Sequence, residues 1–213
     1  MRKAGALSPS AHVLDIGCGA GRLAVPLCAY LDEAGAYTGF DIARPGLRFA
    51  RRVARGRCAI GFVHAELANA EYNRRGADPA DYRFPAEAAT IDLAVATSLF
   101  THILPDVAQA YLREAGRVLK PQGRLMLTAF HVDAEARDAL RSGRARQRLT
   151  PWCEAAWAAD PRHPERAIGF DAEAFLTWAE AAGLRLAQPV IPGDWREPDR
   201  GADFQDWLVF EKA

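Results

Sequence analysis

His12 to Arg22 reads HVLDIGCGAGR, and this stretch decides the fold. An aliphatic run carries the carboxylate of Asp15, three glycines follow at alternate positions, and a helix-compatible segment comes next. This order predicts a strand, a tight turn and a helix. Glycine suits such a turn because it adopts unusual dihedral angles and lets a ligand approach the bare backbone, while the helix N-terminus offers free N–H groups. The stretch therefore predicts a loop that binds a nucleotide-type ligand.

The glycine spacing separates two kinds of nucleotide cofactor. A dinucleotide fingerprint requires Gly-x-Gly-x-x-Gly, but Arg22 stands at the third glycine position and Gly21 comes one residue early. The Asp-x-Gly-x-Gly-x-Gly pattern instead resembles motif I of the class I S-adenosylmethionine-dependent methyltransferases. That resemblance implies that Asp15 faces the amino-acid end of S-adenosyl-L-methionine, which lies across the glycines. The motif alone leaves a structural glycine turn or another nucleotide open.

Length and composition indicate a single globular domain over residues 1–213. The formal net charge is +0 and the pI is about 7.0, which argues against nucleic acid or an anionic membrane as partner. No apolar run approaches the roughly 20 residues of a membrane helix, and the first residues lack the apolar core of a signal peptide. We therefore expect a cytoplasmic protein that acts on a small molecule.

The cysteines do not indicate a metal site. Cys18, Cys28, Cys58 and Cys153 are scattered, without a Cys-x-x-Cys pair or a nearby histidine at ligand spacing. We expect structural thiols, no disulfide framework and no bound metal.

Strands and helices alternate through the first two thirds of the chain, which predicts an α/β, doubly wound parallel sheet with ligands at the carboxyl ends of its strands. Between residues 66 and 84 we expect an irregular loop with at most one helical turn. The predicted strands cover 12–16, 36–42, 58–63, 91–96 and 124–132, and the predicted helices 21–31, 45–53 and 104–119. Pro26 should kink the first helix or mark a later start.

Residues 133–168 break this alternation and predict an insertion after the fifth strand, helical over Ala134 to Leu149. Beyond it, Asp171 is typical of a helix N-cap, and Gly183 ends that helix. Two final strands are expected over 184–191 and 204–210.

Asp41 ends the second predicted strand, where a carboxylate could accept hydrogen bonds from both hydroxyls of a ribose. Ile42 would supply an apolar wall for adenine. The alternatives are a helix N-cap or solvated acid for Asp41 and a core position for Ile42. The remaining residues that we expect at the cofactor site are Asp15, Gly17, Cys18, Gly19, Gly21, Arg22, Thr97 and Ser98.

Further motifs narrow the resemblance to a bacterial subfamily of small-molecule or glycan methyltransferases. They are Tyr72-Asn73 to Gly76, the Ser-x-Phe-Thr-His element from Ser98 to His102, Gly193 to Trp195, and Gln205-Asp206. The resemblance implies a Rossmann-like sheet of seven strands in the order 3-2-1-4-5-7-6, with the last strand antiparallel. Pro121-Gln122-Gly123 departs from the family's usual Pro-Gly-Gly at a turn.

Two histidines are candidates for a base that removes a proton from an alcohol acceptor. His102 follows the fourth strand and His131 lies at the end of the fifth, so both fall near the edge where the methyl group would lie. His102 could instead orient the next helix, and His131 could be a simple strand-end residue. A hydroxyl acceptor is therefore a hypothesis.

The insertion and the last loop are expected to build the acceptor pocket. Trp152, Trp157 and Trp195 could stack on ring faces, and Arg137, Arg141 and Arg148 lie near helical spacing and could bind an anionic acceptor. Alternatively, the arginines form a solvated face and the tryptophans fix the insertion to the sheet. Two other functions stay open: a non-catalytic module that binds S-adenosylmethionine, and a nicotinamide-dependent oxidoreductase.

Overall fold

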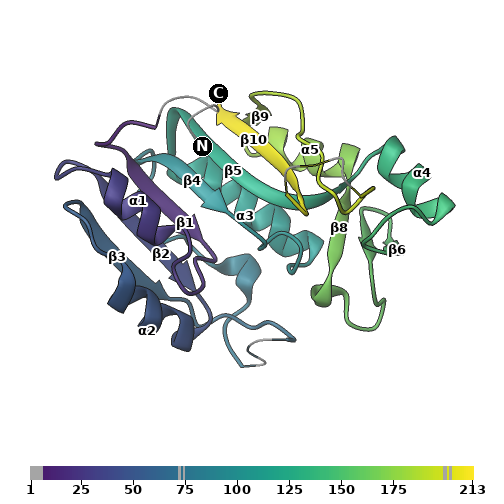
Figure 1. Cartoon of the computed structure of the whole chain (residues 1–213), viewed down its shortest axis with the longest axis horizontal. Helices are drawn as coiled ribbons and strands as arrows, with labels where there is room; N and C mark the ends of the chain where they lie inside the picture. Colours follow the sequence, from purple (N-terminus) through teal and green to yellow (C-terminus); the bar gives the residue numbers. More distant parts are fainter. Residues whose placement is uncertain (1–6, 72, 74, 199–200, 202) are drawn as a thin grey trace.

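The computed structural model describes residues 7–71, 73, 75–198, 201 and 203–213 (Figure 1). Within them one mixed sheet carries helices on both of its faces. The strands are β1 (His12–Ile16), β2 (Ala36–Asp41), β3 (Ala59–His64), β4 (Ile91–Ala96), β5 (Leu119–Val132), β6 (Thr150–Cys153), β7 (Ala156–Ala158), β8 (Ile168–Asp171), β9 (Leu184–Leu186) and β10 (Asp206–Lys212). The helices are α1 (Ala24–Tyr30), α2 (Arg44–Val53), α3 (Pro105–Val118), α4 (Ala134–Ser142) and α5 (Ala172–Ala181), with 3₁₀ turns η1 (Pro79–Asp81) and η2 (Pro164–Arg166).

The central strands follow the order β3-β2-β1-β4-β5-β10-β9. The first five are parallel, β10 is antiparallel to β5, and β9 is antiparallel to β10. This confirms the predicted order 3-2-1-4-5-7-6 with an antiparallel last strand. Because parallel strands end at the same edge, the loops after β1, β2 and β4 meet there.

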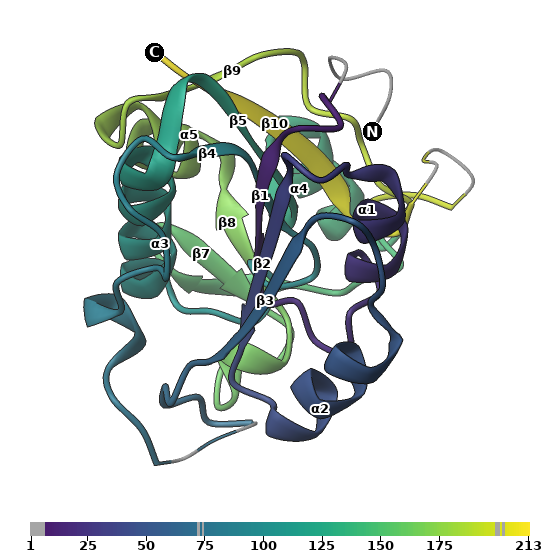
Figure 2. The same cartoon turned by 90° about the vertical axis from the view of Figure 1, so that its left-hand side faces the viewer.

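Alternating side chains of the strands supply two cores. Leu14 and Ile16 of β1 point to the face covered by α3 and α5, whereas Val13 points to the face covered by α1. Figure 2, which views the sheet from its edge, places α3 and α5 on one side and α1 on the other. No described helix is both long and apolar enough to cross a membrane.

Pro26 marks a later start for the first helix, which begins at Ala24. It is the third helical residue, a position whose N–H would have no partner within the helix in any case, so the proline costs no hydrogen bond. The single turn η1 likewise agrees with the prediction of at most one helical turn in the loop after β3.

The α-helix at the start of the insertion is α4, which ends at Ser142, and this corrects the prediction of a helix over Ala134 to Leu149. Gly143 adopts a left-handed conformation with φ 75° and ends α4 at Ser142. The segment then forms the antiparallel strands β6, β7 and β8, and β8 pairs with the last three residues of β5. Ala156 and Ile168 are fully buried in the core beneath α3 and α5, so the insertion is an integral part of the fold.

The sixth strand of the predicted order is also shorter than expected. It runs only over Leu184–Leu186, and within the rest of the predicted strand Pro189 has no N–H to donate to a ladder. Ile191 still contacts β10 through an isolated bridge to Trp207.

Candidate functional site

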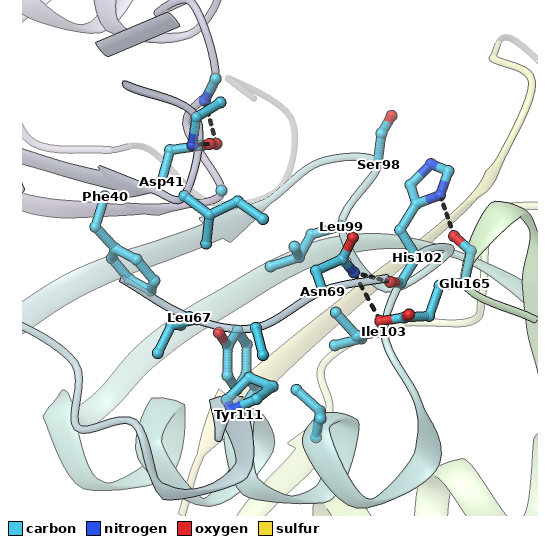
Figure 3. Close-up of a pocket in the computed structure, with 17 residues that line it drawn as sticks. Phe40, Asp41, Leu67, Asn69, Ser98, Leu99, His102, Ile103, Tyr111 and Glu165 are labelled. Atoms are coloured by element: carbon cyan, nitrogen blue, oxygen red, sulfur yellow. Dashed lines mark hydrogen bonds between the residues drawn. The ribbon is translucent and has the colours of Figure 1, made fainter. Parts of the chain in front are cut away.

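A cavity of about 280 Å³ opens at the carboxyl edge of the sheet (Figure 3). Its walls come from the loops after β1, β2, β3 and β4, from the start of α3 and from η2 of the insertion. The lining residues are Gly17, Gly19, Phe40, Asp41, Ile42, Ala43, Leu67, Ala68, Asn69, Pro79, Ser98, Leu99, His102, Ile103, Val107, Tyr111 and Glu165.

The glycine loop is fixed to the end of β2, since the main-chain N–H groups of Gly17 and Cys18 both donate to the carbonyl of Phe40 at 3.0 Å. Gly19 has φ 53°, and a Cβ placed there would meet no atom within 4 Å, so this position leaves open space beside the backbone. Gly21 has φ 82°, and a Cβ there would lie 2.9 Å from that of Ala50 in α2. Gly19 therefore opens the cavity, whereas Gly21 allows the loop to pack closely on α2.

Asp41 lies at the cavity wall with both carboxylate oxygens in use. Oδ2 accepts the main-chain N–H of Gly19 at 2.8 Å, and Oδ1 accepts that of Ala43 at 2.7 Å. Each ionised carboxylate oxygen has two acceptor positions, so both oxygens can accept a further hydrogen bond. Asp41 thus ties the glycine loop to the end of β2 and retains the capacity to bind a diol.

Ser98 has a backbone conformation that is unfavourable for a residue other than glycine, with φ 56°. Its N–H donates to Thr128 Oγ1 at 2.8 Å, and the Thr128 hydroxyl donates to Gln205 Oε1 at 2.5 Å. Gln205 in turn donates to the Thr101 hydroxyl at 3.3 Å. This chain of bonds holds the loop after β4, in which Ser98 lines the cavity, against the last loop.

His102 lies in the same loop and faces the insertion. Its Nδ1 is 2.9 Å from the main-chain carbonyl of Glu165. Because a carbonyl only accepts, Nδ1 carries the hydrogen, and the neutral ring then has its lone pair on Nε2. Figure 3 shows this second nitrogen on the side of the ring turned away from Glu165.

Comparison with known proteins identifies this arrangement. A family described as "Methyltransferase domain" matches residues 13–123. Nocamycin O-methyltransferase of Saccharothrix syringae is 30% identical over 94% of this chain and 77% of its own length. The chain belongs to the class I S-adenosylmethionine-dependent methyltransferases.

Solved structures show the same fold at low identity. A SAM-dependent methyltransferase from Methanosarcina mazei is 19% identical, with a TM-score of 0.62 over 97% of this chain and 94% of that one. The 1,6-didemethyltoxoflavin-N1-methyltransferase of Burkholderia thailandensis is 18% identical, with a TM-score of 0.58 over 95% of this chain and 71% of that one. The family match favours the methyltransferase interpretation over the nicotinamide alternative.

Of the expected cofactor residues of this methyltransferase, Gly17, Gly19, Asp41, Ile42 and Ser98 line the cavity. The structure does not bring the others to it; they are Asp15, Cys18, Gly21, Arg22 and Thr97.

Asp15 is buried on the α1 side of the sheet, directly before the glycine loop. Its Oδ2 accepts the Tyr37 hydroxyl at 2.6 Å, while its Oδ1 has no partner among the described residues. Burial raises the pKa of Asp15 to about 6, although the bond from Tyr37 opposes the rise. The Cys18 side chain is also buried, close to Gly39.

His131 lies away from the cavity and is buried. Its main chain donates to Asp206 at 2.8 Å, and its Nδ1 has no partner within the described part of the chain. Burial lowers the pKa of its imidazole. Among the described residues no group of three or more His, Cys, Asp or Glu side chains could hold a metal ion.

The aromatic residues expected in the acceptor pocket lie in the packing of the insertion. Trp195 is 0% exposed, packs with its ring 5.2 Å from that of Phe130 and donates its indole N–H to Asp206 at 2.7 Å. Trp152 packs against the core beneath α3, and Trp157 against the small core that contains Trp195. None of the three lines the cavity.

The arginines of the insertion are likewise not among the residues that line the cavity. Arg137 pairs with Asp171, and Arg141 lies 3.8 Å from Asp138 on the exposed side of α4. Arg148 lies beyond the end of α4, so it does not share a helical face with the other two.

Sequence reasoning missed the apolar floor of the cavity and two polar residues of its wall, Asn69 and Glu165. The available signal for Asn69 was the Tyr72-Asn73 to Gly76 motif, of which Tyr72 lies outside the described residues. Asn73 donates to the Leu67 carbonyl at 2.8 Å, and a Cβ on Gly76 would lie 2.4 Å from the carbonyl carbon of Leu67. The motif therefore shapes the loop after β3, which forms one wall.

Proposed function

We propose that this methyltransferase transfers the methyl group of S-adenosylmethionine to a hydroxyl oxygen of a small-molecule or glycan acceptor. Asp41 carries the cofactor side of the proposal, because its two oxygens lie at the cavity wall with acceptor capacity for the ribose hydroxyls. Gly17 and Gly19 give the cofactor a bare backbone, and Ile42 gives adenine an apolar wall. Asp15 supplies negative charge behind the loop, toward the amino-acid end.

The hydroxyl acceptor is proposed from the chemistry of His102. Methyl transfer is an in-line displacement, so a dry pocket and good alignment provide most of the rate, and only a weak nucleophile such as an alcohol needs a base. His102 lines the cavity, and because its Nδ1 donates to the Glu165 carbonyl, Nε2 is the ring nitrogen that can accept a proton. The O-methyltransferase among the relatives supports the same choice. We assign no step to His131, because it is buried outside the cavity lining.

The insertion would cover the acceptor. Glu165 of η2 already forms part of the cavity wall. Trp152 and Trp157 are only partly buried, so their exposed parts could contact an acceptor larger than the cavity. Arg137 and Arg141, which are ion-paired, would have to exchange partners to bind an anionic acceptor.

The decisive experiment measures S-adenosylhomocysteine binding to Asp41→Ala by titration calorimetry. Loss of two hydrogen bonds to a charged group is expected to weaken binding by about 2–5 kcal/mol. Asp32→Ala is a matched control, because Asp32 also accepts the N–H two residues later, at 2.9 Å, and lies outside the cavity lining. If Asp41→Ala stays folded and binds S-adenosylhomocysteine as tightly as Asp32→Ala does, the assignment of Asp41 to the ribose is refuted.

Transfer of labelled methyl groups into metabolite and glycan fractions tests the acceptor. Label in an alkali-stable methyl ether supports hydroxyl transfer, and label on nitrogen contradicts it. Binding of S-adenosylhomocysteine without transfer to any fraction would favour the non-catalytic module.

A further inference from the structure

Glu165 joins three segments that are far apart in the sequence. Its carboxylate accepts the Asn69 side-chain amide at 2.7 Å and the main-chain N–H of Ala70 at 2.9 Å, both from the loop after β3. Its own main-chain carbonyl accepts Nδ1–H of His102, from the loop after β4. Figure 3 shows Asn69, His102 and Glu165 grouped on one side of the cavity, away from Asp41.

The bond to His102 decides which ring nitrogen can accept a proton. An imidazole in water exchanges between two neutral tautomers, and a hydrogen bond at one nitrogen selects one of them. Here the carbonyl holds the hydrogen on Nδ1. Only Nε2 of the neutral ring then has a lone pair with which to accept a proton.

The position of that carbonyl depends on the side chain of the same residue. Residue 165 lies in a single 3₁₀ turn, which has little rigidity of its own. Other contacts hold the residues that follow: the Ile168 N–H donates to the Thr101 carbonyl at 3.0 Å, and the Ala167 carbonyl accepts the Ala159 N–H at 2.9 Å. Arg166 pairs with Glu71 at 3.2 Å and lies 3.9 Å from Asp160. These contacts hold residues next to Glu165 in the chain. The two hydrogen bonds to the Glu165 carboxylate, by contrast, hold the same residue whose carbonyl accepts from His102.

We propose that Glu165 is a positioning residue: its carboxylate fixes η2 on the loop after β3, so that its carbonyl holds His102 in the tautomer with Nε2 as proton acceptor. The inserted segment thereby prepares the base as well as covering the acceptor. The inference rests on the proposed function only for the statement that Nε2 removes a proton from the acceptor.

The test observes the tautomer directly, without an acceptor. Long-range ¹H–¹⁵N spectra of the 213-residue chain at pH 8 distinguish Nδ1–H from Nε2–H histidines, and His102→Gln assigns the signal among the five histidines. We expect His102 of the parent protein to be Nδ1–H, and in Glu165→Ala a mixture with a substantial Nε2–H population. Glu165→Gln keeps one acceptor oxygen, so its Nε2–H population should lie between those of the parent and Glu165→Ala. It also provides a second variant if alanine disturbs folding.

Arg166→Ala is the matched control. It removes a neighbouring tie of the same turn and should leave the His102 tautomer unchanged. A parent spectrum with Nε2–H, or Nδ1–H retained in both Glu165 variants, would overturn the proposal. An equal shift of the His102 tautomer population in Arg166→Ala would also overturn it. General loosening of η2 would then explain the shift without the Glu165 carboxylate.

Once an acceptor is known, Glu165→Ala should lower kcat by about 10- to 100-fold, in the same direction as His102→Gln. Binding of S-adenosylhomocysteine to the parent protein tests the proposed function separately. A parent that failed to bind it would refute the proposed function, while the spectra would still decide the role of Glu165.

Discussion

Two aspartates are buried near the carboxyl edge of the sheet, and their surroundings differ. Asp206, at the start of β10, is 0% exposed, and both of its oxygens are satisfied. The four donors are the main-chain N–H groups of His131 and Gly193, the indole of Trp195 and the guanidinium of Arg196. Asp15 in β1 is 1% exposed, and it accepts the Tyr37 hydroxyl on one oxygen while the other has no partner among the described residues.

The difference separates a structural carboxylate from one that the fold alone does not explain. A buried charge is tolerated when hydrogen bonds replace its lost hydration. Asp206 meets this condition and joins β5, β10 and the last loop. Asp15 does not, and the unbalanced burial raises its pKa to about 6. A negative charge held at this cost directly before the glycine loop suits a methyltransferase whose cofactor carries positive charge.

Removal of the Asp206 carboxylate should have the largest effect. Asp206→Ala leaves several buried donors without an acceptor, and Arg196, itself 5% exposed, keeps only Asp133 as a carboxylate partner within the described part of the chain. The free energy of unfolding should fall by about 3–5 kcal/mol, measured by urea denaturation at pH 7. Asp138→Ala, which removes only exposed ion pairs with Arg141 and Arg144, should cost at most about 1 kcal/mol. Equal stability of the two variants would contradict the structural role of Asp206.

The network around Asp206 also shows where sequence reasoning stops. The sequence marks Trp195 and Asp206 as motif residues, but burial of the indole depends on Phe130, which lies 65 positions earlier in the numbering and on another strand. By contrast, β1, β4 and the Asp171 N-cap were predicted at their observed positions, because local periodicity and capping fix them. Strands β6 to β8 have only three or four residues each, and their pairing depends on distant partners.

The candidate cofactor site shows the same division between local and distant signals. The sequence could place Asp41 and Gly19 at the cavity because a carboxylate at a strand end and a glycine-rich turn are local signals. Glu165 could not, since it follows Pro164 in a polar segment and its contacts at the cavity are with Asn69, Ala70 and His102, which lie 96, 95 and 63 positions earlier.

Asp15→Asn should separate the effect of the buried charge on stability from its effect on cofactor binding. The pKa of Asp15 is higher in the folded state than in the unfolded state, so protonation of this carboxyl stabilises the fold. The contribution is complete below the unfolded pKa of 3.8, and it is lost as the pH rises through about 6. The neutral amide avoids that loss. The variant should match the parent near pH 4 and exceed its stability at pH 7 by roughly 1–3 kcal/mol.

The same variant should bind S-adenosylhomocysteine roughly tenfold more weakly, a change of about 1.4 kcal/mol. The reason is that it lacks the negative charge behind the loop, toward the amino-acid end of the ligand with its ammonium group. Thermal denaturation at both pH values and titration calorimetry provide the two measurements. A variant that is less stable than the parent at pH 7 would mean that the charged form of Asp15 is satisfied after all.

Tyr37→Phe should have the smallest effect, and its pH dependence is the informative quantity. The Tyr37 hydroxyl donates to Asp15 at 2.6 Å, and this bond lowers the carboxyl pKa against the effect of burial. Without it the pKa of Asp15 should rise above about 6, so the loss of stability with rising pH should be larger than in the parent. We expect Tyr37→Phe to cost about 1–2 kcal/mol at pH 8 and less at pH 5, where Asp15 is mostly protonated. In an Asp15→Asn background this difference between the two pH values should vanish.

Tyr30→Phe is the control, because that exposed hydroxyl donates to the Leu7 carbonyl rather than to a titratable group. A Tyr37→Phe penalty that is equal at pH 5 and pH 8, or that persists unchanged in the Asp15→Asn background, would assign the effect to ring packing against Phe62.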